Sequence, residues 1–278
     1  PGGDFAAGLP GLMSELLGRR RTGEDCALRG STRWVERLER HRGASDEAHA
    51  RPALRLECVR PGTLDGVALR AVPRESLKRG EIRLRVLASG INFRDVLLAL
   101  GMYAGPRVPL GAECAGVVIE TGPGVTEFAI GQRVFGFAPG SLGTQCVVPA
   151  AFLAPIPVGL GAEAAAALPV ACLTAFHGLH RLAALAAGER VLVHAAAGGV
   201  GLAAVQLAQR LGAEVFATAG LDEKRALLRS LGVRHVMDSR SLAFADEVLA
   251  ATQGEGVRVV LNSLAGEFIA ASLRALKA

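Results

Sequence analysis

The sequence has few aromatic residues and no closely spaced cysteines. Aromatic side chains make up 4% of 278 residues, so the interleaved basic and aromatic pattern of single-stranded nucleic-acid binders is missing. The five cysteines form no CxxC pair, which argues against a disulfide framework or a structural zinc cluster and favours a reducing, cytoplasmic setting. Gly, Pro or charge interrupts every long apolar run, and no basic segment leads into an apolar one at the start. We therefore expect neither a membrane span nor a signal peptide.

Hydrophobic residues account for 50% of the chain and charged residues for 21%, which is enough for one large domain or two smaller ones. Residues 1–50 are polar and rich in chain breakers, and we interpret them as an interdomain linker with some ordered structure. Over residues 51–168, short alternating or apolar runs separated by Pro or Gly predict an antiparallel, barrel-like β region.

Residues 169–278 show a different pattern, in which strands alternate with helical segments. The four predicted strands begin at Val191, Glu214, Arg234 and Val257. This spacing is typical of right-handed βαβ units, so the region is predicted to form a parallel sheet and the chain to be of the α/β class.

The segment VLVHAAAGGVG contains a variant of the GxGxxG dinucleotide turn. Gly198 and Gly201 take the second and third glycine positions, while Ala196 replaces the first. Gly198 and Gly199 would let backbone N–H groups approach a pyrophosphate at a helix N-terminus, and Gly201 would let the helix pack on the strand. The same glycines would also suit a plain strand-to-helix turn, but the flanking strand and amphipathic helix favour nucleotide binding.

The end of the second strand, ATAGLDEKR, indicates which nucleotide is bound. An NAD site usually has a carboxylate there, whereas this sequence offers Thr218, Lys224 and Arg225, which suit a 2′-phosphate. We therefore favour NADPH over NADH. Asp222 could still take the NAD role, and DEKR could be an ordinary charged first helical turn.

A β-barrel followed by a nucleotide-binding sheet resembles the medium-chain dehydrogenase/reductase superfamily. The resemblance implies a GroES-like substrate domain (51–168) and a Rossmann-type nucleotide-binding domain (169–278). Zinc-dependent members carry a GHE segment, but here GAECAG has Ala112 at the histidine, so no catalytic zinc is expected. His177 and His180 have no Cys or carboxylate nearby in sequence and are interpreted as packing or solvated side chains. Hydride transfer without a Lewis acid suits an activated alkene.

Four longer strings, GINFRDVLLALGMY, LPVACLTAFHGL, HAAAGGVGLAAVQLA and VLNSLAGEFIAASLRAL, resemble the enoylreductase domain of modular polyketide synthases and animal-type fatty acid synthases. The upstream string EDCALRGSTRWVERL is similar to the linker that precedes this domain. The resemblance implies NADPH-dependent reduction of a trans-2-enoyl thioester carried by an acyl carrier protein, among neighbouring synthase domains. Hydride goes to the β-carbon and a proton to the α-carbon of the resulting enolate. The net charge of +5 would suit an acidic carrier surface.

The resemblance also assigns roles to individual residues. Asn92 and Thr174 are expected near the nicotinamide, with Asn262 closing the pocket. The remaining cofactor residues are expected along the pyrophosphate (Ala197, Gly198, Gly199, Val200, Gly201) and around the adenosine end (Thr218, Lys224, Arg240). Arg240 could equally be a surface arginine.

Tyr103 is the single tyrosine, and the resemblance implies that it protonates the α-carbon to give an S-configured methyl branch. A phenol holds its proton at neutral pH and can act as a general acid, although a structural tyrosine bonded to the backbone is the alternative. Asp95 could be catalytic, or could form an ion-paired helix start with Arg94.

Two other functions remain open from the sequence. One is a zinc-independent quinone oxidoreductase, and the other is a catalytically silent domain that docks its neighbours in a synthase. The family pattern also continues with a further strand that carries a Lys, then an Asp, and a segment that completes the barrel domain. We expect both the sheet and the barrel to be incomplete within the printed sequence.

Overall fold

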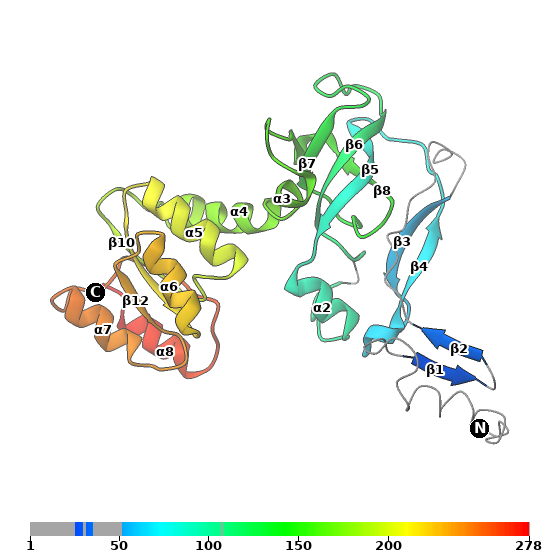
Figure 1. Ribbon diagram of the computed structural model, residues 1–278. Helices are drawn as coiled ribbons and strands as arrows, with labels where there is room; N and C mark the ends of the chain where they lie inside the picture. The colour runs from blue at the N-terminus through cyan, green and yellow to red at the C-terminus, as the bar shows by residue number, and fades with distance from the viewer. Residues whose placement is uncertain (1–25, 30–31, 36–51, 107, 278) are drawn as a thin grey trace. The chain divides into compact units, whose positions relative to one another are not determined.

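The computed structural model describes residues 26–29, 32–35, 52–106 and 108–277 (Figure 1). The chain divides into two compact units, Pro1–Arg51 and Pro52–Ala278. In the first unit, β1 (Cys26–Arg29) and β2 (Thr32–Val35) form an antiparallel hairpin. Most of the predicted linker lies outside the described residues.

The first part of the second unit is antiparallel. One sheet has the strand order β8-β5-β6-β7-β9, and β3 and β4 form a separate hairpin. Fully buried apolar side chains from alternate strand positions fill its core, Leu84, Val118, Val134 and Val148 among them. The elements in chain order are β3 (Ala53–Cys58), η2 (Leu64–Gly66), β4 (Val67–Val72), β5 (Glu81–Gly90), α2 (Phe93–Ala99), β6 (Glu113–Thr121), β7 (Arg133–Phe137), β8 (Gln145–Pro149), η3 (Ala150–Phe152), β9 (Leu153–Pro155) and α3 (Ala162–Ala166).

The second part is a parallel sheet with the strand order β12-β11-β10-β13. An α-helix follows each strand, as in βαβ units. None of the helices in the described part of the chain is long and apolar enough to cross a bilayer. The elements are α4 (Pro169–Phe176), the π-helical η4 (His177–Leu182), β10 (Arg190–Val193), α5 (Gly199–Arg210), β11 (Glu214–Ala219), α6 (Asp222–Ser230), β12 (His235–Asp238), α7 (Phe244–Ala251), β13 (Val259–Leu261) and α8 (Glu267–Arg274).

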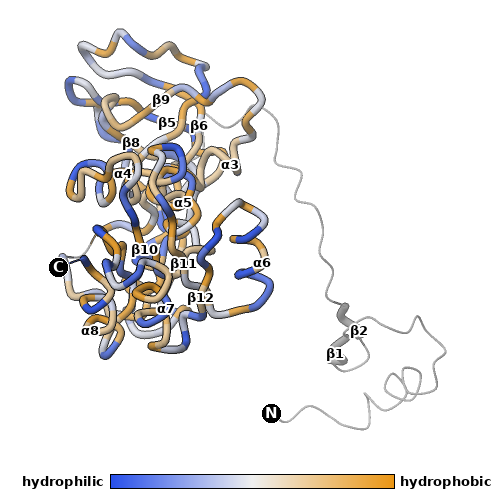
Figure 2. Tube along the Cα trace, turned by 90° about the vertical axis from the view of Figure 1, so that its left-hand side faces the viewer, coloured by the Kyte–Doolittle hydropathy of each residue, from blue (hydrophilic) through white to orange (hydrophobic). Residues whose placement is uncertain are grey.

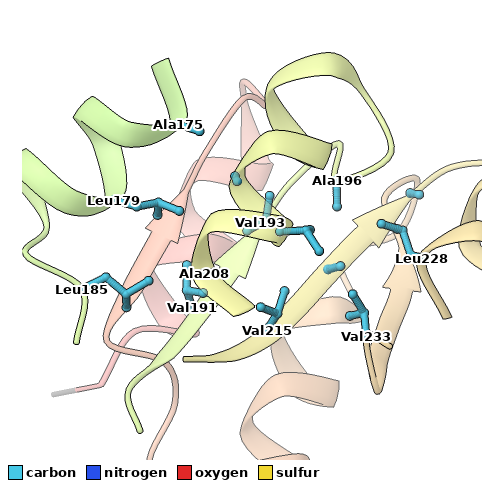
Figure 3. Close-up of a cluster of buried hydrophobic side chains, with 14 residues drawn as sticks. Ala175, Leu179, Leu185, Val191, Val193, Ala196, Ala208, Val215, Leu228 and Val233 are labelled. Carbon is cyan, nitrogen blue, oxygen red and sulfur yellow. The ribbon is translucent and has the colours of Figure 1, made fainter. Parts of the chain in front are cut away.

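The alternation of strand side chains builds two cores, one on each face of this sheet. Val191 and Val193 of β10 pack with residues of α4 and α5 (Figure 3), whereas Leu192 between them packs with Phe244 of α7 on the opposite face. Figure 2 shows that α6 is mostly hydrophilic with one hydrophobic stretch. Leu228 of this helix is fully buried and packs in the first of these cores. Burying a side chain of this size stabilises the fold by roughly 1.5–3 kcal/mol.

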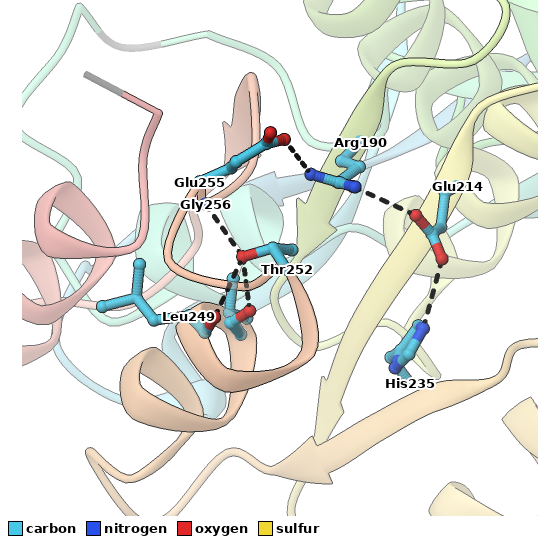
Figure 4. A network of polar contacts seen from close by, with 8 residues as sticks. Arg190, Glu214, His235, Leu249, Thr252, Glu255 and Gly256 are labelled. Atoms are coloured by element: carbon cyan, nitrogen blue, oxygen red, sulfur yellow. Dashed lines mark hydrogen bonds and ion pairs between the residues drawn. The ribbon is translucent and has the colours of Figure 1, made fainter.

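At the amino ends of the strands, charged side chains tie the sheet together (Figure 4). Arg190 pairs with Glu214 at 3.2 Å and with Glu255 at 2.8 Å, and Glu214 also contacts His235 at 3.2 Å. Partly exposed ion pairs of this kind contribute little each. Because these contacts link the first residues of β10, β11 and β12, they help to hold the strand register. None of them involves the carboxyl ends of the strands.

The structure confirms the predicted α/β fold and shifts some strand boundaries. The fourth strand begins at Val259 rather than Val257, because Val257 forms a bridge with Leu276 and donates its N–H to Ala275 O at 2.9 Å. The strand predicted from Arg234 begins at His235.

A buried polar network lies directly beyond β10. His194 is 3% exposed, with Nδ1 at 2.9 Å from Thr218 Oγ1 and Nε2 at 3.0 Å from Ser272 Oγ. Ser272 donates its own proton to Phe268 O, so Nε2 carries the imidazole proton and Nδ1 accepts from Thr218. The neutral imidazole is thus fully hydrogen-bonded, and burial lowers the pKa of His194 to about 4.

This lowered pKa predicts a loss of stability in acid. Between pH 6.5, the ordinary pKa of histidine, and about pH 4, the unfolded chain binds a proton at position 194 that the folded chain does not. The free energy of unfolding should therefore decrease as the pH is lowered from 6.5 to about 4, and this residue should account for up to about 3 kcal/mol of the decrease. Urea unfolding of wild type and His194→Gln across this range measures the effect, and the variant should show a shallower fall. His180→Gln, at an exposed histidine, should follow the wild type. Equal slopes for wild type and His194→Gln would contradict the assignment.

Candidate functional site

The predicted nucleotide turn lies between β10 and α5, at the carboxyl end of the parallel sheet. The N-cap of α5 is Gly198, which has no side chain to cap the helix, and its N–H donates to Ala195 O at 2.9 Å. Ala195 itself has a left-handed φ of 48°. The first N–H groups of an uncapped helix lack intrahelical acceptors and point outward, which makes this end a natural anion-binding position.

The glycines of the turn differ in what surrounds them. A Cβ at Gly201 would lie 2.4 Å from Ala195 O and 2.5 Å from Ala196 Cα, so only glycine permits the close approach of α5 to β10. A Cβ at Gly199 would meet its nearest atom at 4.0 Å, which leaves open space above the helix end. Ala197 and Val200 are half-buried beside this opening. The structure thus separates a packing glycine, Gly201, from Gly199, which borders free space.

At the end of β11, cationic side chains gather near Gly220. A Cβ at Gly220 would lie 3.1 Å from Arg240 Nε, so this side chain lies over the strand end. Arg225 donates to Ala219 O at 2.9 Å and pairs with Asp222, whose side chain is 95% exposed. Lys224 is exposed on the first turn of α6. The carboxylate that could have played the NAD role is thus engaged by an arginine.

Thr218 lies elsewhere than expected for a phosphate ligand. It is fully buried on the face of β11 that carries Phe216, and its hydroxyl is hydrogen-bonded to His194. The sequence pattern placed it at the strand end but did not reveal which face it occupies. Its side chain belongs to the core network and is not exposed at the carboxyl edge.

The predicted residues of α2 form a tight helix start. Asp95 is 4% exposed and accepts from the Asn92 N–H and from the Gly111 N–H, each at 2.9 Å. The alternative of an Arg94–Asp95 ion pair is wrong, because both carboxylate oxygens of Asp95 accept from backbone N–H groups and no ion pair joins Asp95 to Arg94 among the described residues. Asp95 therefore joins α2 to the segment before β6.

The sequence reasoning missed Glu113, the first residue of β6. It is 3% exposed, and its carboxylate accepts from Asn92 Nδ2 at 2.9 Å and from the Val170 N–H of α4 at 2.7 Å. A glutamate in the otherwise apolar run GAECAGVV was the available signal, because an isolated buried carboxylate requires donors. Glu113 brings Asn92 next to the beginning of α4.

The three remaining predicted residues make no hydrogen bond to Asn92, Asp95 or Glu113 in the described structure. Thr174 is exposed on α4. Asn262 closes its own loop after β13, donating to Leu264 O and accepting from the Leu264 N–H, both at 3.0 Å. Tyr103 is 36% exposed, and within the described residues its hydroxyl has no hydrogen-bond partner. The alternative of a tyrosine bonded to the backbone is therefore not what the structure shows.

The described residues contain no group of three or more His, Cys, Asp or Glu side chains placed to hold a metal ion. His177 and His180 are both exposed, and the His180 ring lies 4.7 Å from that of Phe176. Cys114 and Cys146 lie 3.8 Å apart in the core of the antiparallel sheet. The hydrogen bond between them, together with burial, raises the pKa of Cys146, so this thiol stays protonated.

Comparison with known families gives two matches, one on each part of the unit. Residues 78–158 match the model described as alcohol dehydrogenase GroES-like domain. Residues 199–278 match the model described as zinc-binding dehydrogenase. The two models therefore cover the antiparallel sheet and the part of the parallel sheet that follows the nucleotide turn.

Individual proteins resemble the chain over most of its length. The polyketide synthase GfsB of Streptomyces halstedii is 51% identical over 228 residues, which cover 81% of this chain, whereas the chain spans only 4% of that protein. The mycobacterial Rv1454c structure complexed with NADPH has a TM-score of 0.74 and 32% identity, over 81% of this chain and 71% of its own.

The crystal structure of CurK enoyl reductase has a TM-score of 0.78 and 41% identity, over 82% of this chain and 72% of its own. The chain therefore belongs to the medium-chain dehydrogenase/reductase superfamily and, within it, to the enoyl reductases of polyketide synthases.

Proposed function

We propose that this chain reduces a trans-2-enoyl thioester on an acyl carrier protein with NADPH. The observation that carries the proposal is the uncapped N-terminus of α5 at the carboxyl end of the sheet, with open space above Gly199. The similarity to an enoyl reductase and to an NADPH complex supports it. We further propose the linker, substrate and nucleotide domains as residues 1–50, 51–168 and 169–278.

The residues of the chain fit NADPH along the carboxyl edge of the sheet. The turn from Ala197 to Gly201 would hold the pyrophosphate, because an uncapped helix end favours negative charge. The Gly198 N–H already donates to Ala195 O, so the N–H groups of Gly199, Val200 and Gly201 at the start of the helix would make the contacts. Arg240 and Lys224 would bind the 2′-phosphate, while Thr218 supports the turn from within the core. Bound NADPH supplies the hydride that reduces the alkene.

Substrate chemistry is assigned to the residues around α2 and α4. Asn92 and Thr174 would flank the nicotinamide, and Asn262 would close the pocket from the loop after β13. Tyr103 would donate the α-proton, since its hydroxyl is accessible and has no partner among the described residues. Asp95 would support Asn92 through the hydrogen bond to its N–H rather than by contact with substrate.

The glycine turn offers a test of cofactor binding. Gly199→Ala should weaken NADPH binding by about tenfold or more without loss of stability, because the added methyl occupies open space where the pyrophosphate would lie. Nicotinamide fluorescence titration measures the affinity, and urea unfolding measures stability. Gly161→Ala, a glycine whose Cβ would also be free of close contacts, is the matched control.

Gly201→Ala should behave differently from Gly199→Ala. Its methyl would collide with the backbone of β10, so the free energy of unfolding should fall by about 1–3 kcal/mol. Unchanged NADPH affinity in Gly199→Ala, or unchanged stability in Gly201→Ala, would contradict the roles given to the two glycines.

Selectivity for NADPH should depend on Arg240. Removing its charge-assisted hydrogen bonds to the 2′-phosphate should raise the dissociation constant of NADPH by about tenfold to a hundredfold and leave that of NADH unchanged. Fluorescence titration of Arg240→Ala with both cofactors tests this. Arg229→Ala, an exposed arginine on the far turn of α6, should change neither constant. An equal loss of affinity for NADPH and NADH would show that Arg240 does not contact the 2′-phosphate.

Tyr103→Phe should preserve NADPH binding but slow or redirect protonation. With a 2-methyl-enoyl pantetheine thioester, the loss of nicotinamide absorbance and the configuration of the product report on the two steps. We expect the wild type to give the S product. In the variant, either the rate of NADPH oxidation should fall by about a hundredfold or the product should no longer be of a single S configuration. An unchanged rate and configuration would exclude Tyr103 as the donor. Oxidation of NADPH by a quinone but not by the thioester would overturn the proposed function itself.

A further inference from the structure

Glu113 is a buried carboxylate held by hydrogen bonds from two different elements. Oε1 accepts from the side chain of Asn92 before α2, and Oε2 accepts from the backbone of Val170, in the first turn of α4. Among the described residues it forms no ion pair. The two N–H donors and the positive end of the helix dipole therefore compensate its burial.

The backbone around Glu113 is shaped to receive this carboxylate. A Cβ at Gly90 would lie 2.2 Å from Glu113 Oε1, so the carboxylate occupies the space that a side chain at position 90 would fill. In the opposite direction, Asp95 of α2 accepts from the Gly111 N–H at 2.9 Å. Two carboxylates thus connect the same pair of segments, one from each side.

Glu113 also fixes the orientation of the Asn92 amide. A carboxylate can only accept, so the nitrogen of the amide must face it and the oxygen must face away. A glutamine at position 113 would present an N–H₂ group to Asn92 if its oxygen kept the Val170 N–H. Asn92 would then have to turn its amide over to supply an acceptor. The identity of the residue at 113 therefore decides whether the nitrogen or the oxygen of the Asn92 amide faces away from position 113 and toward the start of α2.

The same carboxylate touches the helix that carries Thr174. Besides its bond to Val170, it lies close enough to Cys172 to raise the pKa of that thiol, after the larger effect of burial. The two residues assigned to the nicotinamide, Asn92 and Thr174, come from separate elements of the chain. Glu113 is in contact with both of these elements.

We propose that Glu113 is a positioning residue for hydride transfer, which acts by orienting the Asn92 amide and by holding the beginning of α4 beside it. The proposal rests on the proposed function, since it concerns the nicotinamide pocket. Small errors in the placement of reacting groups reduce rates steeply even when binding is retained.

Glu113→Gln in the full chain tests the proposal, because the reversed amide keeps a hydrogen bond and should preserve the fold. We expect the single-turnover rate of NADPH oxidation by the enoyl thioester to fall by about tenfold or more. The fluorescence emission of bound NADPH should shift, while its dissociation constant and the urea midpoint stay close to wild type. Glu120→Gln, which removes a partly exposed carboxylate from the same strand, should leave rate and emission unchanged.

The dependence on Asn92 separates positioning from a general structural effect. In the Asn92→Ala background, Glu113→Gln should cause no further loss of rate and no further shift of emission. A full additional loss in that background, or a wild-type rate and emission in Glu113→Gln alone, would overturn the proposal. Should Glu113→Gln not fold, the double variant N92D/E113Q restores a donor and acceptor pair. A folded double variant with a wild-type rate and emission would support the proposal, because the contact between positions 92 and 113 is rebuilt, and a double variant that stays impaired would overturn it.

The outcomes also distinguish this proposal from the proposed function. If wild type binds NADPH but does not reduce the thioester, the proposed function fails. The emission of bound NADPH then decides the role of Glu113: a shift in Glu113→Gln that disappears in the Asn92→Ala background supports it, and the absence of any shift overturns it.

Discussion

The close approach of α5 to the end of β10 is the constraint on which the parallel-sheet part of the structure depends. Gly201 lies against the backbone of Ala195 and Ala196, where any Cβ would collide. This contact fixes the helix N-terminus at the carboxyl edge of the sheet and leaves the space above Gly199 free. Because the helix end is uncapped, its N–H groups remain available for an anion.

The two ends of the parallel sheet carry different chemistry. At the amino ends, Arg190 forms ion pairs with Glu214 of the next strand and with Glu255 of a neighbouring loop, and Glu214 also contacts His235. At the carboxyl ends, Arg240 lies over Gly220 at the end of β11, and the first N–H groups of α5 follow β10. The arginine at the amino end is thus paired, whereas the carboxyl edge offers N–H donors that lack intrahelical partners, and this is the edge where ligands of open α/β sheets bind.

Buried polar side chains connect elements that are distant in the sequence. His194 joins the end of β10 to β11 and α8, and Glu113 joins β6 to α2 and α4. Each is satisfied by neutral donors or acceptors rather than by an opposite charge. Such groups tolerate little rearrangement, because a donor or acceptor left unpaired in the interior is costly.

Local sequence patterns determined the order of elements, the nucleotide turn and the family. Period-two alternation, glycine spacing and the strings around Asn92 and Tyr103 depend on near neighbours, so they can be read without coordinates. The faces and partners of single polar residues depended on tertiary structure. Thr218 is buried rather than exposed, Asp95 bonds to Gly111 rather than to Arg94, and Glu113 meets Val170, because each contact joins segments that only folding brings together.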